Sequence, residues 1–203
     1  MQANGAVPNL PFDNVVLSDQ VAAAMLDAYE GTKRDGMERG FNLCGKRDRD
    51  SVYVERPGST CTGSDCKIQI EDCVGEETEV VGLFHTHPIS SNAPSAGDLF
   101  TVVRHYAYKK ISAPLDCRAA YNGLRCEILH LKPPSNFKEL AHEYKQMYNR
   151  YEQLLKMDTL EALQEVETIE EREQQIINAL LPSFFSYKFS FSDLEHSIRE
   201  KHG

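Results

Sequence analysis

Two histidines separated by one residue follow a short apolar run. His85 and His87 come directly after residues 80–84, whose sequence is VVGLF. The length and composition of this run predict a buried strand. Alternate side chains of a strand share one face and lie about 6.6 Å apart at Cα, and imidazole nitrogens are ligands of zinc. The spacing therefore predicts that both histidines bind one metal ion at the end of a strand.

A serine and an aspartate follow at a spacing that is typical of a helix start. Ser95 and Asp98 precede the apolar residues Leu99, Val102 and Val103, so we expect them to be the N-cap and N3 residues of a helix. A carboxylate beside two histidines completes a His, His, Asp set. Three protein ligands leave the fourth position of a tetrahedral zinc open for water, as in catalytic sites. The same Ser and Asp spacing is also common as a capping device alone, and the two interpretations are compatible.

These residues resemble the signature of the JAMM, or MPN-plus, metalloproteases, His-[Ser/Thr]-His-x7-Ser-x2-Asp. His85, Thr86, His87, Ser95 and Asp98 match it without a gap. The resemblance implies an α/β fold of the MPN (JAMM) type, with a curved, mostly antiparallel sheet flanked by helices. It also implies a zinc isopeptidase or peptidase with one catalytic Zn2+, often one that removes ubiquitin or ubiquitin-like modifiers from conjugates.

The family also has a glutamate some tens of residues before the histidines. Glu38, which precedes the apolar, glycine-bounded run 39–45, fits that place best. By resemblance, Glu38 is the general base and the Ser95 hydroxyl donates to the developing oxyanion. Glu79 is discounted because six residues on one strand would place it about 20 Å from a metal at His85. The remaining candidates for the base are Glu55, Glu71, Glu76 and Glu77.

Helix and strand patterns on either side of the motif agree with the implied fold. Ser18 should cap a helix with an inward apolar face, and residues 52–55 have a strand pattern. After the motif helix, residues 115–121 and 125–131 also read as strands, and Asn122-Gly123 between them is a strong hairpin signal. The sequence therefore predicts an α/β catalytic domain.

The composition becomes typical of helices beyond Ser135, about two-thirds of the way along the 203-residue chain. This change predicts a catalytic domain, residues 1–134, and a C-terminal helical extension, residues 135–203. Residues 136–180 contain neither Gly nor Pro. They predict either one long helix or a hairpin whose second helix is capped by Asp158. Aromatic and polar residues alternate from 185 to 191, a strand pattern. We expect the extension to pack on the core, and it is a candidate surface for a proteasome-like or other protein partner.

Two further segments, an insertion before the histidines and the end of the chain, also have recognisable patterns. Residues 57–77 lie between the Glu38 strand and the histidine strand and contain a loop rich in Pro, Gly, Ser and Thr, a strand near Ile68 and an acidic turn. In the family, such an insertion often contacts the modifier. Ser192 and Glu195 have capping-box spacing and predict a short final helix.

The six cysteines form two groups. The first lies in the insertion and comprises Cys61, Cys66 and Cys73. It lacks a Cys-x2-Cys pair, so the signal for structural zinc is weak, and a disulfide within it is left open because it depends on the compartment. The second lies in strand-like sequence and comprises Cys44, Cys117 and Cys126. We expect these three to be buried small hydrophobes.

Charge and hydropathy exclude some classes of function. The formal net charge of -9 argues against a general nucleic-acid binder, because phosphate contacts require clustered Lys and Arg. No apolar run is long enough to span a membrane, and the first residues lack the pattern of a secretory signal. We therefore expect a cytoplasmic protein without nucleic-acid or membrane partners.

Two other functions stay open beside the isopeptidase. The same fold without its ligands serves as a non-catalytic scaffold or binding module. Some prokaryotic relatives instead hydrolyse a small-molecule substrate or a sulfur-carrier conjugate. The complete Glu, His, His, Asp set favours an enzyme, whereas the modifier and its linkage do not follow from the sequence.

Overall fold

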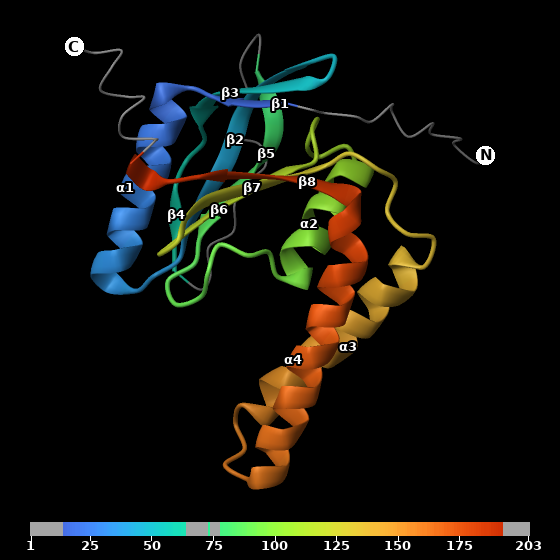
Figure 1. Ribbon diagram of the computed structural model, residues 1–203. Coiled ribbons are helices and arrows are strands. Elements are labelled where there is room, and N and C mark those ends of the chain that lie inside the picture. Colours follow the sequence, from blue (N-terminus) through green and yellow to red (C-terminus); the bar gives the residue numbers. More distant parts are fainter. Residues whose placement is uncertain (1–13, 64–72, 74–77, 193–203) are drawn as a thin grey trace.

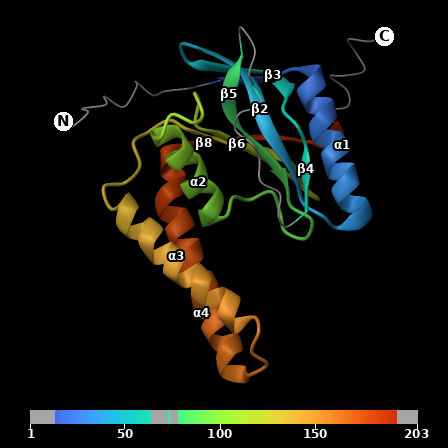
Figure 2. The same ribbon diagram turned by 180° about the vertical axis from the view of Figure 1, so that it is seen from behind.

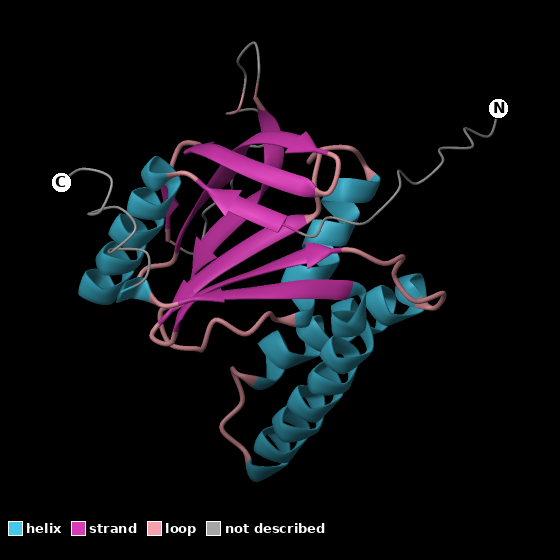
Figure 3. Ribbon diagram, turned by 45° about the horizontal axis from the view of Figure 1, so that its top comes forward, coloured by secondary structure: helices cyan, strands magenta, loops and turns pink. Residues whose placement is uncertain are grey.

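The computed structural model describes residues 14–63, 73 and 78–192, which form an α/β architecture with one curled, mixed sheet and four α-helices (Figures 1 and 3). The helices are α1, Asp19–Asp35; α2, Ala96–Ala107; α3, Phe137–Leu154; and α4, Leu160–Leu180. The strands are β1, Asn14–Leu17; β2, Arg39–Asp48; β3, Ser51–Pro57; β4, Cys61–Thr62; β5, Glu79–Thr86; β6, Leu115–Ala120; β7, Gly123–Leu129; and β8, Phe184–Phe189. Helix α1 lies on one side of the sheet, and α2, α3 and α4 lie on the other (Figure 2).

The sheet has the strand order β1-β3-β2-β5-β6-β7-β8, and β4 pairs with β2 off this path. β1 is parallel to β3 and β5 is parallel to β6, whereas the other neighbours are antiparallel. The expected mostly antiparallel sheet is therefore corrected to a mixed sheet. The reason is that α2 connects β5 to β6 as a long crossover, and a connection of this kind lets two neighbouring strands run in parallel.

Apolar side chains form a core cluster on each face of the sheet. One cluster contains Val21 and Met25 of α1 together with Phe84 of β5. The other contains Leu99 of α2 together with Ile176 of α4. The helix that carries the Ser and Asp of the motif is thus packed between the sheet and the C-terminal helices.

The first helix and the strand expected at residues 52–55 are confirmed. Ser18 caps α1 by accepting a hydrogen bond from Val21 N at 3.2 Å. Gly36 ends the helix in the left-handed conformation, with φ 72°, which glycine adopts without a Cβ clash. The strand expected at residues 52–55 lies within β3.

The hairpin expected after the motif helix is present as β6 and β7, with its turn one residue earlier than predicted. Ala120 pairs with Gly123, so the turn residues are Tyr121 and Asn122. Gly123, with φ 107°, is already the first residue of β7. The difference of one residue sets which side chains face each other across the two strands.

The C-terminal helical segment is a hairpin of α3 and α4 that extends away from the sheet (Figure 1). Thr159, rather than Asp158, caps α4, because the Thr159 hydroxyl accepts a hydrogen bond from Ala162 N at 3.1 Å. The chain then returns to the sheet, where the aromatic segment forms β8 and pairs antiparallel with β7. β8 therefore shares one sheet with strands that precede residue 134.

Disulfide bonds correct the expectation for the cysteines. Cys44 is bonded to Cys73 and Cys117 to Cys126, and Cys61 is also disulfide-bonded. Cys44, Cys117 and Cys126 are buried as expected, but they are not free thiols. The fold is the reason, since it brings the paired Cα atoms to 5.3 Å and 4.0 Å, and cysteines more than about 7 Å apart cannot be bridged.

Some expectations fall on residues outside the described part of the chain. They concern Cys66, the strand near Ile68, the base candidates Glu71, Glu76 and Glu77, and the final helix beyond Ser192. Within the segment 64–77, Cys73 is the one described residue.

Candidate metal centre

Both histidines lie at the C-terminal end of strand β5. The strand ends at Thr86, so His85 is its second-last residue and His87 is the first residue after the strand. Backbone pairing fixes this end on both sides, because Gly40 of β2 and Arg118 of β6 are the register partners of His85. Alternate side chains share a face of a strand. The two imidazoles therefore meet, with their Nε2 atoms 3.0 Å apart.

Helix α2 delivers the carboxylate. As expected, Ser95 is the N-cap and Asp98 is N3: Asp98 N donates to Ser95 Oγ at 3.1 Å, and Ser95 N donates to Asp98 Oδ2 at 2.8 Å. These reciprocal bonds hold Asp98 Oδ1 3.4 Å from His85 Nε2 and Asp98 Oδ2 3.9 Å from His87 Nε2. One donor atom from each of the three side chains lies within 4.8 Å of the others. The structure thus brings His85, His87 and Asp98 together.

The far nitrogen of each imidazole faces its own acceptor. His87 Nδ1 lies 2.8 Å from Ser91 O, and His85 Nδ1 lies 3.7 Å from Asp116 Oδ1. An acceptor beside one ring nitrogen favours a proton there and leaves the lone pair of the other nitrogen for a metal. Two imidazole nitrogens and one carboxylate oxygen are a donor set that fits zinc.

Charges around the triad favour the protonation states that bind a metal. Burial alone would raise the pKa of Asp98, but the charge of His85, a hydrogen bond with His85, the charge of Arg118 and the Ser95 N–H together hold this pKa well below its ordinary value. Burial and the charge of His85 lower the pKa of His87. An ionised carboxylate and a neutral imidazole are the forms that coordinate metal ions.

Glu38 lies directly before β2, beside the end of β5. Two residues later, Gly40 pairs with His85. Desolvation raises the pKa of the Glu38 carboxyl, the charge of His85 opposes this shift, and the charge of Asp98 adds to it. The charges of His85 and Asp98 therefore both act on the Glu38 carboxyl group. The residue as a whole is exposed.

The rival glutamates that the structure describes are placed differently. Glu55 of β3 forms an ion pair with Lys46 at 2.9 Å. Glu79 begins β5, at the opposite end of the strand from His85. Of Glu38, Glu55 and Glu79, Glu38 is therefore the one that adjoins the end of β5 where His85 lies.

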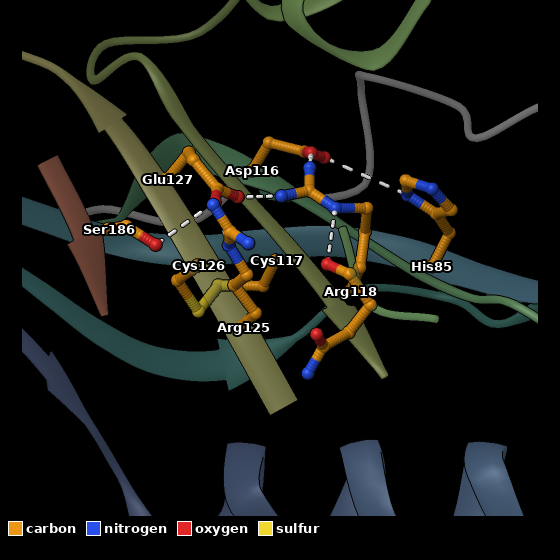
Figure 4. The surroundings of a disulfide bond; sticks show 9 residues. His85, Asp116, Cys117, Arg118, Arg125, Cys126, Glu127 and Ser186 are labelled. Atoms are coloured by element: carbon orange, nitrogen blue, oxygen red, sulfur yellow. Dashed lines mark hydrogen bonds and ion pairs between the residues drawn. A yellow bond between two sulfur atoms is a disulfide. The ribbon is translucent and has the colours of Figure 1, made fainter. Parts of the chain in front are cut away.

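Charged side chains that the sequence analysis missed lie behind His85, on one face of β6 and β7 (Figure 4). This buried charge row consists of Asp116, Arg118, Arg125 and Glu127. Arg118 pairs with Asp116 and Glu127, and Arg125 also pairs with Glu127. Burial lowers the pKa of Arg118 to about 10, which leaves it charged at neutral pH. The sequence signal was the alternation Asp-x-Arg and Arg-x-Glu within two otherwise apolar strands.

The loop of residues 87–95 is held by Asn92, another residue that the sequence did not reveal. Asn92 N donates to Asn122 Oδ1 at 2.9 Å, and Asn92 Nδ2 donates to Gly123 O at 3.0 Å. The carbonyl of Asn92 accepts from Arg118 Nε at 3.4 Å. The loop between the histidines and α2 is thus tied both to the β6–β7 turn and to the buried charge row.

The C-terminal hairpin contacts the first turn of α2. Glu173 Oε1 of α4 accepts a hydrogen bond from Ala96 N at 3.2 Å. The hydroxyl of Tyr144, on α3, lies 2.9 Å from the place that a Cβ on Gly97 would occupy. Glu173 and Tyr144 thus lie against the helix start that carries the carboxylate of the triad.

A scan against protein-family models and a search of curated proteins each find no match for the chain. Within the described ranges, no helix is long and apolar enough to cross a membrane.

Proposed function

We propose that the chain is a zinc-dependent isopeptidase or peptidase of the JAMM, MPN-plus type that acts on conjugates of ubiquitin or a ubiquitin-like modifier. The observation that carries the proposal is the convergence of His85, His87 and Asp98 from two elements, with donor atoms within 4.8 Å of one another. Their spacing is that of the family signature. The strand end and the capped helix start around them are the context in which that signature operates.

Each residue of the set has a chemical role in this proposal. His85, His87 and Asp98 would hold the ion, and a bound zinc polarises a carbonyl and lowers the pKa of a water towards neutrality. Glu38 accepts a proton from the attacking water and passes it to the leaving amine. The Ser95 hydroxyl accepts the Asp98 N–H, so its own hydrogen can be donated to the developing oxyanion.

Metal analysis of the purified chain and of His87→Ala tests the ligand assignment. The unsubstituted chain should contain one zinc, and His87→Ala should lose it because one of three protein ligands is removed. His142→Ala is the control, since His142 is exposed on α3. Stoichiometric zinc in His87→Ala would show that the assignment is wrong. Iron in place of zinc would contradict the proposal, because non-haem iron enzymes use a similar two-histidine, one-carboxylate set.

Cleavage of a panel of conjugates tests the reaction. The zinc-loaded chain should hydrolyse at least one ubiquitin-like fusion or isopeptide conjugate, and a chelator should abolish this activity. A zinc-loaded chain that binds a modifier but cleaves none of its conjugates would instead indicate a scaffold. Turnover of a small-molecule or sulfur-carrier conjugate alone would indicate the third function.

A further inference from the structure

His85 lies between two carboxylates, one on each side of its ring. Asp98 Oδ1 is 3.4 Å from Nε2, and Asp116 Oδ1 is 3.7 Å from Nδ1. The second distance is longer than a direct hydrogen bond, so Asp116 acts through its charge on the side of the ring that faces away from the triad. His87 has a corresponding acceptor on its far nitrogen, the carbonyl of Ser91. Asp116 therefore faces Nδ1 of His85, just as the Ser91 carbonyl faces Nδ1 of His87.

The buried charge row supplies Asp116 with a cationic partner, Arg118. Asp116 is the register partner of Glu127, and Arg118 is that of Arg125, so all four side chains lie on one face of β6 and β7. Asp116 is 3% exposed and Arg118 and Glu127 are 0% exposed. An isolated carboxylate at such burial would become neutral, because burial of an unpaired charge is costly. Two cations beside two carboxylates remove that cost.

The same row gives the Asp116 carboxylate a fixed orientation (Figure 4). Arg118 contacts Asp116 and Glu127, and its Nε donates to the carbonyl of Asn92 at 3.4 Å. Glu127 Oε1 in turn accepts from Ser186 Oγ of β8 at 3.1 Å. A rotation of the Asp116 side chain would disturb the guanidinium of Arg118, which is also held by Glu127 of β7 and by the loop of residues 87–95.

We propose that Asp116 is a positioning residue of the metal centre: held by Arg118, it faces Nδ1 of His85 and orients the ring so that Nε2 is presented to the metal. The inference rests on the proposed function for the identity of the ligand, but it concerns an imidazole that is present with or without metal. Loss of such an outer partner typically weakens metal binding by about 10- to 100-fold. Asp116 contacts neither substrate nor reacting atoms in this role.

Asp116→Asn and Glu127→Gln form a matched pair of variants. Each replaces a buried carboxylate that contacts Arg118 by an amide of the same shape, but only Asp116 faces His85. Both should unfold at lower denaturant concentration, whereas only Asp116→Asn should weaken zinc binding by about 10- to 100-fold in competition with a chelator. Asp116→Glu keeps the charge and should recover part of the affinity. Equal zinc affinity in the two amide variants would overturn the proposal.

Crystal structures of the metal-free variants test the same role without zinc. The ring of His85 should keep Nε2 turned towards His87 in the unsubstituted chain, where the two Nε2 atoms are 3.0 Å apart, and in Glu127→Gln. Asp116→Asn should release this ring, while the ring of His87 keeps its orientation because the Ser91 carbonyl is unchanged. A chain that binds no zinc would contradict the proposed function alone, and the ring orientation would still test Asp116. An unchanged His85 ring in Asp116→Asn would overturn the role of Asp116.

Discussion

Thr86 separates the two candidate histidine ligands and faces the opposite side of β5. It is fully buried. Its Oγ1 accepts a hydrogen bond from Arg39 N at 2.9 Å and shares another with Thr32 Oγ1 of α1 at 2.7 Å. Arg39 directly follows Glu38, so the Thr86 hydroxyl joins the strand that carries the histidines to the segment that carries the candidate base.

Thr86→Val should lower the free energy of unfolding by about 1–3 kcal/mol, because the substitution keeps the shape of the side chain and leaves the Arg39 N–H without this acceptor. Denaturant unfolding followed by circular dichroism measures the change. Thr86→Ser is the control, since it retains the hydroxyl. Equal stability of the valine and serine variants would show that the hydroxyl does not hold β2 to β5.

Glu38→Gln tests the general base. Glutamine keeps the size of Glu38 but cannot accept the proton of the water, so kcat should fall by about 10²–10⁴-fold with KM little changed. Steady-state kinetics on a cleaved conjugate give both constants, and metal analysis checks that zinc is retained. Glu55→Gln is the matched control. Loss of turnover in Glu55→Gln with normal turnover in Glu38→Gln would assign the base to Glu55.

The ligand residues could be predicted from the sequence because their relations are local. His85 and His87 are two residues apart on a strand, and Ser95 and Asp98 are three apart at a helix start, so alternation and capping place them. Asp116 and the rest of the buried charge row could not be recognised in this way. Alternating charges in a strand ordinarily indicate a solvated face, but here Asp116, Arg118 and Glu127 are buried, and the loop of residues 87–95 contacts Arg118.

At the scale of elements, the start of α2 depends on α4. Glu173 accepts from the first N–H group of the helix, that of Ala96, where a carboxylate also interacts favourably with the helix dipole. Glu173→Ala should therefore lower the free energy of unfolding by about 1.5 kcal/mol, as measured by denaturant titration. Glu173→Gln should lose less because it keeps an acceptor. Glu171→Ala, at an exposed position of α4, is the control, and a loss of equal size there would contradict the role of Glu173.

The hairpin of β6 and β7 shows why register limits what a sequence can predict. A turn centred on Asn122 and Gly123 would set Cys117 opposite Ile128. The turn lies one residue earlier, so Gly123 is already paired and Cys117 faces Cys126. A single residue of turn position thus decides whether the disulfide forms and whether Asp116 lies opposite Glu127.

At the scale of the whole molecule, the two disulfides described here close loops of different length. The sequence separation is 29 residues for Cys44–Cys73 and 9 residues for Cys117–Cys126. Chain entropy predicts stabilisation of about 3.6 kcal/mol for the first and about 2.7 kcal/mol for the second. The larger value belongs to the bond that ties the insertion to β2.

Cys44→Ser with Cys73→Ser should therefore lower the free energy of unfolding more than Cys117→Ser with Cys126→Ser. Mass spectrometry of the alkylated chain first establishes that the bonds are formed, and denaturant unfolding without reductant then compares the two double variants. The opposite order of stabilities would show that native-state packing, rather than loop length, determines the effect.

The sequence predicted the α/β class but not the mixed sheet. Helix and strand patterns are local, whereas parallel pairing depends on which strands become neighbours after a crossover. No pattern within β1 or β3 indicates that they lie side by side, because the contacts that decide it involve α1 and β2 as well. The pairing of β8 with β7 could not be predicted either, because the two strands are far apart in the sequence.

The pairing of β8 with β7 also has a consequence for the synthesis of the protein. β7 ends at Leu129 and β8 begins at Phe184, so the ribosome must add about 55 further residues before β7 has its partner, which takes about 3–11 s at 5–20 residues per second. During this interval the nascent sheet has an open edge at β7, and an open edge can pair with another chain. The order in which the strands are synthesised therefore sets an interval in which β7 can pair with another chain before β8 covers it.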